Sequence, residues 1–316
     1  MAQVRIETVD FGGWPNSYRM TNGTIELVAT SAVGPRIIRF GFVGERNLFK
    51  VFADQLGQTG GDHWRPYGGH RLWHAPEAMP RTYQPDNAPV EVEVGRDTLL
   101  LRQGVEPATG IRKEMQISME APANRVTVRH RLYNEGPWPV TLAAWALTMM
   151  DPGGIGVVPQ PPYAPHPQAL LPAEPLVLWP YTDMSDPRWT WGRKYILLRQ
   201  DSSATLPQKA GYGTRQGWAA YGLEGFLFVK HFAYVDGAEY PDMGSSVETF
   251  TNADMLELET LSPLRTLTAP AEPNRPAFVE HIEHWSLFRD VRWEANDHDV
   301  DAKVLPLVES GARVVP

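Results

Sequence analysis

The sequence has no cysteine among its 316 residues. This absence excludes disulfide bonds, thiol nucleophiles and zinc sites built on cysteine. No apolar run approaches the length of a membrane-spanning helix. The N-terminal stretch MAQVRIETVD also lacks the apolar region of a signal peptide. We therefore expect a cytoplasmic protein that does not enter a membrane.

Positive charge is in short supply, with 29 Lys and Arg against 37 Asp and Glu and a formal net charge of −8. Nucleic acids and anionic membranes require a basic face, so neither is an expected partner. No glycine-rich phosphate-binding motif and no G-x-S-x-G nucleophile elbow is present. His70 and His74 are four residues apart, but Gly68, Gly69 and Pro76 argue against the helix that would align them on a metal. We expect neither a metal nor a cofactor.

Helical patterns are scarce, and the best of them, residues 299–310, contains Pro306. Alternating apolar and polar residues, typical of strands, recur along the chain instead. They occupy residues 90–105, 111–120, 125–136, 194–200, 218–235, 246–261 and 278–291. Residues 140–150 are more continuously apolar, as in a strand buried on both faces. The pattern predicts an all-β fold, a sandwich of two large antiparallel sheets with few helices, in a single domain covering residues 1–316.

Aromatic residues are plentiful, with 11 Trp and 11 Tyr. They would suit a large β core, and they would equally suit an aromatic cleft for sugars, whose apolar ring faces stack on such side chains.

The stretch YGGHRLWHAPE, residues 67–77, crowds His70, Arg71, Trp73 and His74 behind two glycines. Charged groups are costly to bury without partners, and a glycine pair lets the backbone turn sharply toward a ligand. This run is either one wall of a sugar-binding cleft or a surface loop of unusual composition.

Two carboxylates stand out in MLELETLSPL, residues 255–264, because Glu257 and Glu259 share one face of the expected strand. They either face solvent or line a pocket. In a pocket, their mutual repulsion and loss of water would raise a pKa toward neutrality, which suits a general acid or base.

Further candidates lie in three other segments, and each also has a purely structural explanation as loop scaffold, core residue or edge strand. They are Tyr181, Asp186 and Arg188 within residues 178–195, His231, Tyr240 and Asp242 within 231–250, and His281 within 278–288.

Four stretches carry a family resemblance. NRVTVRHRLYNEGPWPVTLAAWALT (124–148) and DMLELETLSPL (254–264) resemble strands of the galactose mutarotase-like (aldose 1-epimerase) superfamily. GGHRLWHAPE (68–77) and LWPYTD (178–183), together with ELETLSPL (257–264), resemble an uncharacterised bacterial branch of this superfamily. The resemblance implies a β-supersandwich over roughly residues 20–290 with an open cleft for sugar. It implies Glu259 as the catalytic base and His70 as a sugar-binding residue.

The same resemblance implies a catalytic histidine directly after the buried central strand. This chain has MMDPGG there instead, so Asp151, His74, His231 or His281 would have to serve as the acid. The function implied is an aldose 1-epimerase-like isomerase that interconverts sugar anomers. A glycoside hydrolase or polysaccharide lyase on the same scaffold, or a sugar-binding protein without catalysis, remains an alternative. The particular sugar and the oligomeric state are left open.

Overall fold

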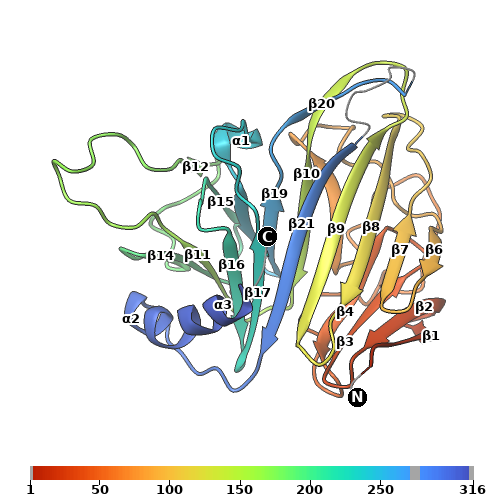
Figure 1. Ribbon diagram of the computed structural model, residues 1–316, viewed down its shortest axis with the longest axis horizontal. Coiled ribbons are helices and arrows are strands. Elements are labelled where there is room, and N and C mark those ends of the chain that lie inside the picture. The colour runs from red at the N-terminus through yellow and green to blue at the C-terminus, as the bar shows by residue number, and fades with distance from the viewer. Residues whose placement is uncertain (1–2, 271–277, 313–316) are drawn as a thin grey trace.

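The computed structural model describes residues 3–270 and 278–312, and antiparallel strands are the main regular element among them (Figure 1). The strands form two large sheets that pack face to face. The all-β sandwich expected from the alternating pattern is therefore confirmed.

The larger sheet holds most of the candidate residues in its middle strands. Its path runs β1-β2-β3-β4-β5-β10-β19-β18-β15-β12, and β20 pairs with β10 outside this path. The bounds are β1 Arg5–Phe11, β2 Trp14–Thr21, β3 Ile25–Thr30, β4 Arg36–Phe42, β5 His70–Ala75, β10 Val140–Met150, β19 Leu256–Leu261, β18 Val247–Thr251, β15 Gln208–Tyr212, β12 Leu176–Leu178 and β20 Arg265–Leu267.

The second sheet backs the first one and follows the order β13-β14-β11-β16-β17-β21-β9-β8-β7-β6. Its bounds are β13 Trp189–Trp191, β14 Tyr195–Arg199, β11 Ile155–Pro159, β16 Trp218–Leu223, β17 Phe226–Phe232, β21 Phe278–Phe288, β9 Arg125–Asn134, β8 Ile111–Met119, β7 Thr98–Arg102 and β6 Glu91–Val94.

The main core lies between the two sheets. At its centre Trp285 of β21 packs against Phe40, Phe49 and Phe228 with ring centroids 5.4–5.7 Å apart. Strand β10 is buried from Leu142 onward, so it has apolar neighbours on both faces, as its continuous apolar run predicts.

Helical segments are short, and all of them except α1 lie near the C-terminal end of the described chain. They are α1 Pro241–Gly244, α2 Asp297–Asp299, the π-helical η1 Val300–Val304 and α3 Leu305–Gly311. Val300, Val304 and Val308 cover the outer face of the second sheet (Figure 1). Pro306 sits in the first turn of α3, where its missing N–H costs little. No helix in the described part of the chain is long and apolar enough to cross a membrane.

Candidate functional site

A pocket of about 410 Å³ opens on the face of the larger sheet that points away from the second sheet. Its floor comes from β5, β10, β15 and β19, and its walls come from the segments that surround them. The lining residues are Phe52, Trp64, Pro66, Arg71, Trp73, Glu77, Tyr83, Trp145, Leu147, Met149, Tyr181, Lys209, Phe250, Asn252, Asp254, Met255 and Glu257.

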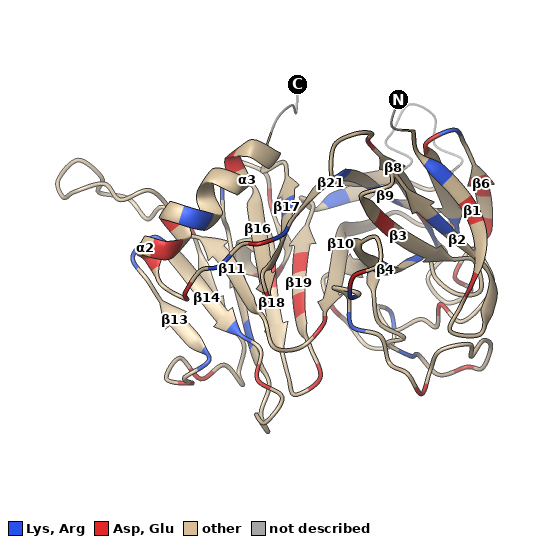
Figure 2. Cartoon of the chain, turned by 90° about the horizontal axis from the view of Figure 1, so that it is seen from below, with Lys and Arg blue, Asp and Glu red and all other residues tan. Residues whose placement is uncertain are grey.

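Strand pairing explains why residues far apart in the sequence meet on this floor. Alternate side chains of a strand point to the same face, and residues paired across strands share that face. Arg71 pairs with Leu147, and Leu147 with Glu259. One step along β19, Glu257 pairs with Met149 on one side and with Phe250 on the other. The acidic positions of β19 are visible next to β18 in Figure 2.

The start of β5 depends on the glycine pair that precedes it. Gly68 and Gly69 have φ values of 105° and 77°, in the left-handed region that favours glycine. A Cβ at either position would lie only 2.1 or 2.2 Å from the carbonyl oxygen of Lys50 or Ile37. The expected sharp turn is therefore present, and it brings Arg71 and Trp73 onto the pocket floor.

Four aromatic rings form one wall, and two of them contact Arg71. Trp73 packs at 4.9–5.5 Å between centroids against Trp64, Tyr83 and Trp145. The Arg71 guanidinium lies 4.1 Å from the Trp73 ring and 4.9 Å from the Trp64 ring. Such cation–π contacts hold the guanidinium in one place.

Glu257 is the buried carboxylate that lines the pocket. Its Oε1 lies 3.2 Å from Nη2 of Arg71. Burial raises the pKa of Glu257 to about 7; the Arg71 charge opposes this rise, and the nearby Glu259 adds to it. A carboxyl group with this pKa can take up and release a proton near neutral pH.

Next to Glu257 on the pocket floor, Lys209 lies between two fully buried carboxyl groups. Its Nζ is 2.8 Å from Oε2 of Glu248 and 3.5 Å from Oε2 of Glu259, which also accepts a 2.8 Å hydrogen bond from Nε1 of Trp145. Burial lowers the pKa of Lys209, but Glu259 and Glu248 outweigh it and raise this pKa well above the ordinary value. Lys209 therefore remains a cation. Tyr181, whose pKa burial raises to about 12, likewise keeps its proton.

Of the predicted sugar-binding residues, Arg71, Trp73, Tyr181 and Glu257 line this pocket. Glu259, the base implied by the family resemblance, lies on the same face but is fully buried and absent from the lining.

The two histidines of the 67–77 stretch require a correction. His70 and His74 alternate with Arg71 and Trp73 along β5, so they point into the sandwich and not into the pocket. His70 lies between Thr148 and Nε2 of His130, each 2.7 Å away. His74 lies 3.5 Å from Glu106, which pairs with Lys113 at 2.6 Å.

His70 belongs to a buried polar network in the core. Glu283 accepts hydrogen bonds from Lys230 and from Nε1 of Trp285, both at 2.8 Å. His70, His130 and Glu283 also form the one group of at least three His, Cys, Asp or Glu in the described chain with ligand atoms close enough for a metal ion. However, the two imidazole nitrogens are 2.7 Å apart and share a proton, and the Lys230 ammonium opposes a second cation. The contacts indicate a structural network.

Three more candidates for the catalytic acid lie away from the pocket. Asp151 pairs with Arg46 at the far end of β10, His231 packs beside Gly311 of α3, and His281 hydrogen-bonds Thr260 inside the sandwich. Tyr240 precedes α1 and Asp242 lies within it, and neither lines the pocket; the Tyr240 hydroxyl accepts a hydrogen bond from the Val235 amide. Side chains alternate between the two faces of a strand and change direction at turns, so these five side chains do not point toward the pocket.

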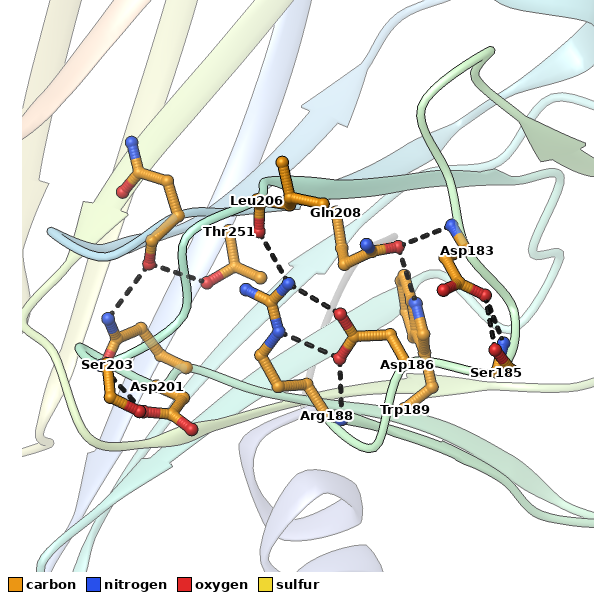
Figure 3. Close-up of polar contacts among 12 residues, drawn as sticks. Asp183, Ser185, Asp186, Arg188, Trp189, Asp201, Ser203, Leu206, Gln208 and Thr251 are labelled. Atoms are coloured by element: carbon orange, nitrogen blue, oxygen red, sulfur yellow. Dashed lines mark hydrogen bonds and ion pairs between the residues drawn. The ribbon is translucent and has the colours of Figure 1, made fainter.

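Asp186 and Arg188, also predicted to contact sugar, bind each other (Figure 3). Two hydrogen bonds of 2.8 and 2.9 Å join the side chains, and Nη2 of Arg188 also donates to the Leu206 carbonyl at 2.6 Å. Neighbouring Gln208 accepts bonds from the Asp183 amide and the Trp189 indole. These contacts anchor the loop that carries Tyr181.

Replacing Arg188 with Met is expected to lower the free energy of unfolding by about 1–3 kcal/mol, because Asp186 and the Leu206 carbonyl lose their charged donor. Urea denaturation followed by tryptophan fluorescence measures this loss. The exposed Arg5 provides the control, and Arg5→Met should change the unfolding free energy by less than about 0.5 kcal/mol. Equal stability of the two variants would show that the Asp186–Arg188 pair does not anchor the loop.

Sequence reasoning did not select several lining residues, among them Trp64, Tyr83, Trp145 and Lys209. Trp145 lies in a continuously apolar strand, and Lys209 is an isolated cation in QKAGY. The sequence around Trp145 or Lys209 does not indicate a site residue, because the role of each depends on which strands become its neighbours in the sheet. The unusual tryptophan count was the available indication of an aromatic wall.

Comparison with known proteins finds similarity to this chain in three-dimensional structure only. No protein-family model matches the chain, and no curated protein matches its sequence. Among solved structures, a candidate aldose 1-epimerase from Klebsiella pneumoniae is similar at 10% identity and a TM-score of 0.57, over 97% of this chain and 87% of the other. A galactose mutarotase-like protein from Lactobacillus casei is similar at 8% identity and a TM-score of 0.53, over 86% and 100%. At these identities the comparison concerns the fold: the chain has the galactose mutarotase-like β-sandwich fold.

Proposed function

We propose that the pocket on the outer face of the larger sheet binds a sugar ring and interconverts its two anomers by general acid/base catalysis. The observation that carries this proposal is Glu257, a pocket-lining carboxyl group with a pKa of about 7 beside an aromatic wall. Aromatic rings suit the apolar faces of a sugar, and a group that titrates near neutrality suits proton transfer. The fold, shared with a candidate aldose 1-epimerase, is in keeping with this chemistry.

In the proposed reaction the ionised Glu257 accepts the proton of the anomeric hydroxyl. As that O–H bond breaks, the C1–O1 bond becomes a carbonyl and the bond from C1 to the ring oxygen opens. Lys209 or Tyr181, which both keep their protons and line the pocket, donates a proton to the ring oxygen. Rotation about the C1–C2 bond and reversal of the proton transfers then give the other anomer.

Glu259 has a supporting part in this proposal. Its carboxylate is fully buried, accepts the Trp145 indole N–H and lies 3.5 Å from Lys209. It therefore orients Trp145 and keeps Lys209 protonated, whereas Glu257 faces the substrate.

The test is exchange NMR of freshly dissolved aldoses, which measures the rate of α/β interconversion with and without the protein. We expect at least one of glucose, galactose, xylose, arabinose and rhamnose to interconvert faster with the protein present. An unchanged rate for all five sugars would contradict the proposed isomerase.

A second carboxyl group in the pocket supports glycoside hydrolysis as the alternative function. Glu77, from the segment after β5, lines the same pocket as Glu257, and a glycoside hydrolase requires two such carboxyl groups. Release of p-nitrophenol from aryl glycosides, without acceleration of anomer exchange, would support hydrolysis in place of isomerisation. Binding of sugars without either activity would support a sugar-binding protein.

A further inference from the structure

Buried hydrogen-bond donors in the pocket lack acceptors. Among the lining residues of the described chain, the buried side-chain atoms without a hydrogen-bond partner are Nε and Nη1 of Arg71 and Nε1 of Trp64. Guanidinium and indole N–H groups donate hydrogen bonds and do not accept them. Because an unsatisfied buried donor is costly, a ligand that supplies acceptor atoms at this place is favoured.

The guanidinium of Arg71 is held in a fixed position. Arg71 is 2% exposed, and its guanidinium lies 4.1 Å from the Trp73 ring and 4.9 Å from the ring of Trp64. Its contact with Glu257 is made by Nη2. An acceptor on Nε or Nη1 therefore leaves that contact in place, and Glu257 remains available as the proposed base.

The positive charge of Arg71 is weakly compensated by its neighbour Glu257. An arginine stays charged at every physiological pH, and a strong charged pair has an N···O distance of roughly 2.7–2.9 Å. The distance from Nη2 of Arg71 to Oε1 of Glu257 is 3.2 Å. Burial raises the pKa of Glu257 to about 7, so about half of these carboxyl groups are protonated at pH 7. In those molecules Glu257 does not compensate the Arg71 charge.

The other charged groups that line the pocket leave Arg71 as the buried cation that can receive an anion. Lys209 already has a carboxylate partner, because its Nζ lies 2.8 Å from Oε2 of the fully buried Glu248. Glu77 and Asp254 line the pocket but are exposed, so water and salt screen their charges. Their repulsion of an anion bound to Arg71 is therefore weak.

From these contacts we infer that the preferred ligand is a uronic acid, whose carboxylate accepts hydrogen bonds from Arg71 while its ring stacks on the aromatic wall. This inference rests on the proposed sugar site and specifies the class of sugar. A carboxylate has acceptors and no donor, is planar like the guanidinium, and carries one charge to match one arginine. A sugar phosphate also brings acceptors, but its roughly 1.5–2 negative charges at pH 7 exceed what Arg71 alone compensates.

The experiment is a calorimetric titration of the wild-type protein at about pH 7, where the carboxyl group of a uronic acid is ionised. Glucuronate is compared with glucose, with glucuronamide, which keeps the shape but not the charge, and with glucose 6-phosphate; the galactose series is treated likewise. We expect the uronate of at least one series to bind roughly tenfold or more tighter than its neutral parent sugar, as for hydrogen bonds between charged groups. The uronamide should lose most of this gain, and the sugar phosphate should bind more weakly than the uronate.

A charge-matched pair of variants locates the effect. Arg71→Gln should remove most of the preference for the uronate, whereas Arg5→Gln changes the net charge equally and should retain it, because Arg5 is exposed on β1 at the edge of the larger sheet. The comparison of ligands uses the wild-type protein, so it tests the inference whether or not Arg71→Gln folds.

The outcomes separate this inference from the proposed function. Equal affinity for uronate and parent sugar, equal affinity for uronate and uronamide, or tighter binding of the sugar phosphate would overturn the inference and leave the sugar site standing. A folded Arg71→Gln variant that keeps the preference for the uronate would do the same. Absence of binding by every sugar in both series would overturn the proposed function together with the inference.

Discussion

Replacing Glu257 with Gln is expected to slow protein-catalysed anomer interconversion by about 10²–10⁴-fold, the usual contribution of a positioned acid or base. The amide has nearly the same shape, so it keeps the packing of β19 against β10 and β18, but it cannot accept the anomeric proton. Exchange NMR with the preferred aldose measures the loss. Glu91→Gln is the control and should keep the wild-type rate, since β6 lies in the other sheet.

The wild-type rate should also depend on pH in one direction. The pKa of Glu257 is raised to about 7, mainly by burial, and the proposed base is its ionised form. Below that pKa the ionised fraction falls about tenfold for each pH unit, so the rate should fall in the same proportion and should level off above it. A rate that increases on acidification, or a Gln variant with full activity, would contradict the role of Glu257 as the base.

Replacing Lys230 with Met is expected to lower the free energy of unfolding by about 3–5 kcal/mol. Lys230 is fully buried, and its Nζ lies 2.8 Å from Oε1 of Glu283 and 3.0 Å from the Leu258 carbonyl oxygen. Despite burial, the Lys230 charge holds the pKa of Glu283 below its ordinary value, so Glu283 stays ionised. Without the ammonium, a carboxylate would remain in the core with no cation beside it.

Equilibrium urea denaturation measures this loss, and an exposed ion pair provides the comparison. Lys194 pairs with Asp301 at the surface, and Lys194→Met should cost no more than about 1 kcal/mol. The double variant Lys230→Met/Glu283→Gln should recover part of the stability, because it removes both charges of the buried pair. Equal losses for Lys230→Met and Lys194→Met would show that the buried pair contributes no more than a surface pair.

The strands themselves were predictable because their signal is local. Apolar residues at every second position mark a half-buried strand whatever its neighbours are, and β9 alternates in this way from Arg125 to Asn134. The continuous apolar run of β10 likewise predicted burial on both faces. The carboxylates of β19 were also identified, since Glu257 and Glu259 alternate with leucines that face the core.

The face of β5 was not predictable from its sequence. All six residues from His70 to Ala75 are buried, so hydrophobicity does not distinguish the pocket side from the core side. His70 and His74 looked like site residues because histidine is common in such sites, yet both are held by polar partners inside the sandwich. Arg71 and Trp73, which lie between the two histidines in the sequence, line the pocket.

The sequence by itself determined the all-β class, the positions of the main strands and the presence of two carboxylates on one strand face. The tertiary structure decided which of these side chains meet. Lys209, Trp145 and Glu259 come from three strands that are distant in the chain, and they join only because β15, β10 and β19 lie in one sheet. The physical reason is that side-chain alternation follows from the geometry of a single strand, whereas the partners and the pKa of a buried group depend on which strands become its neighbours.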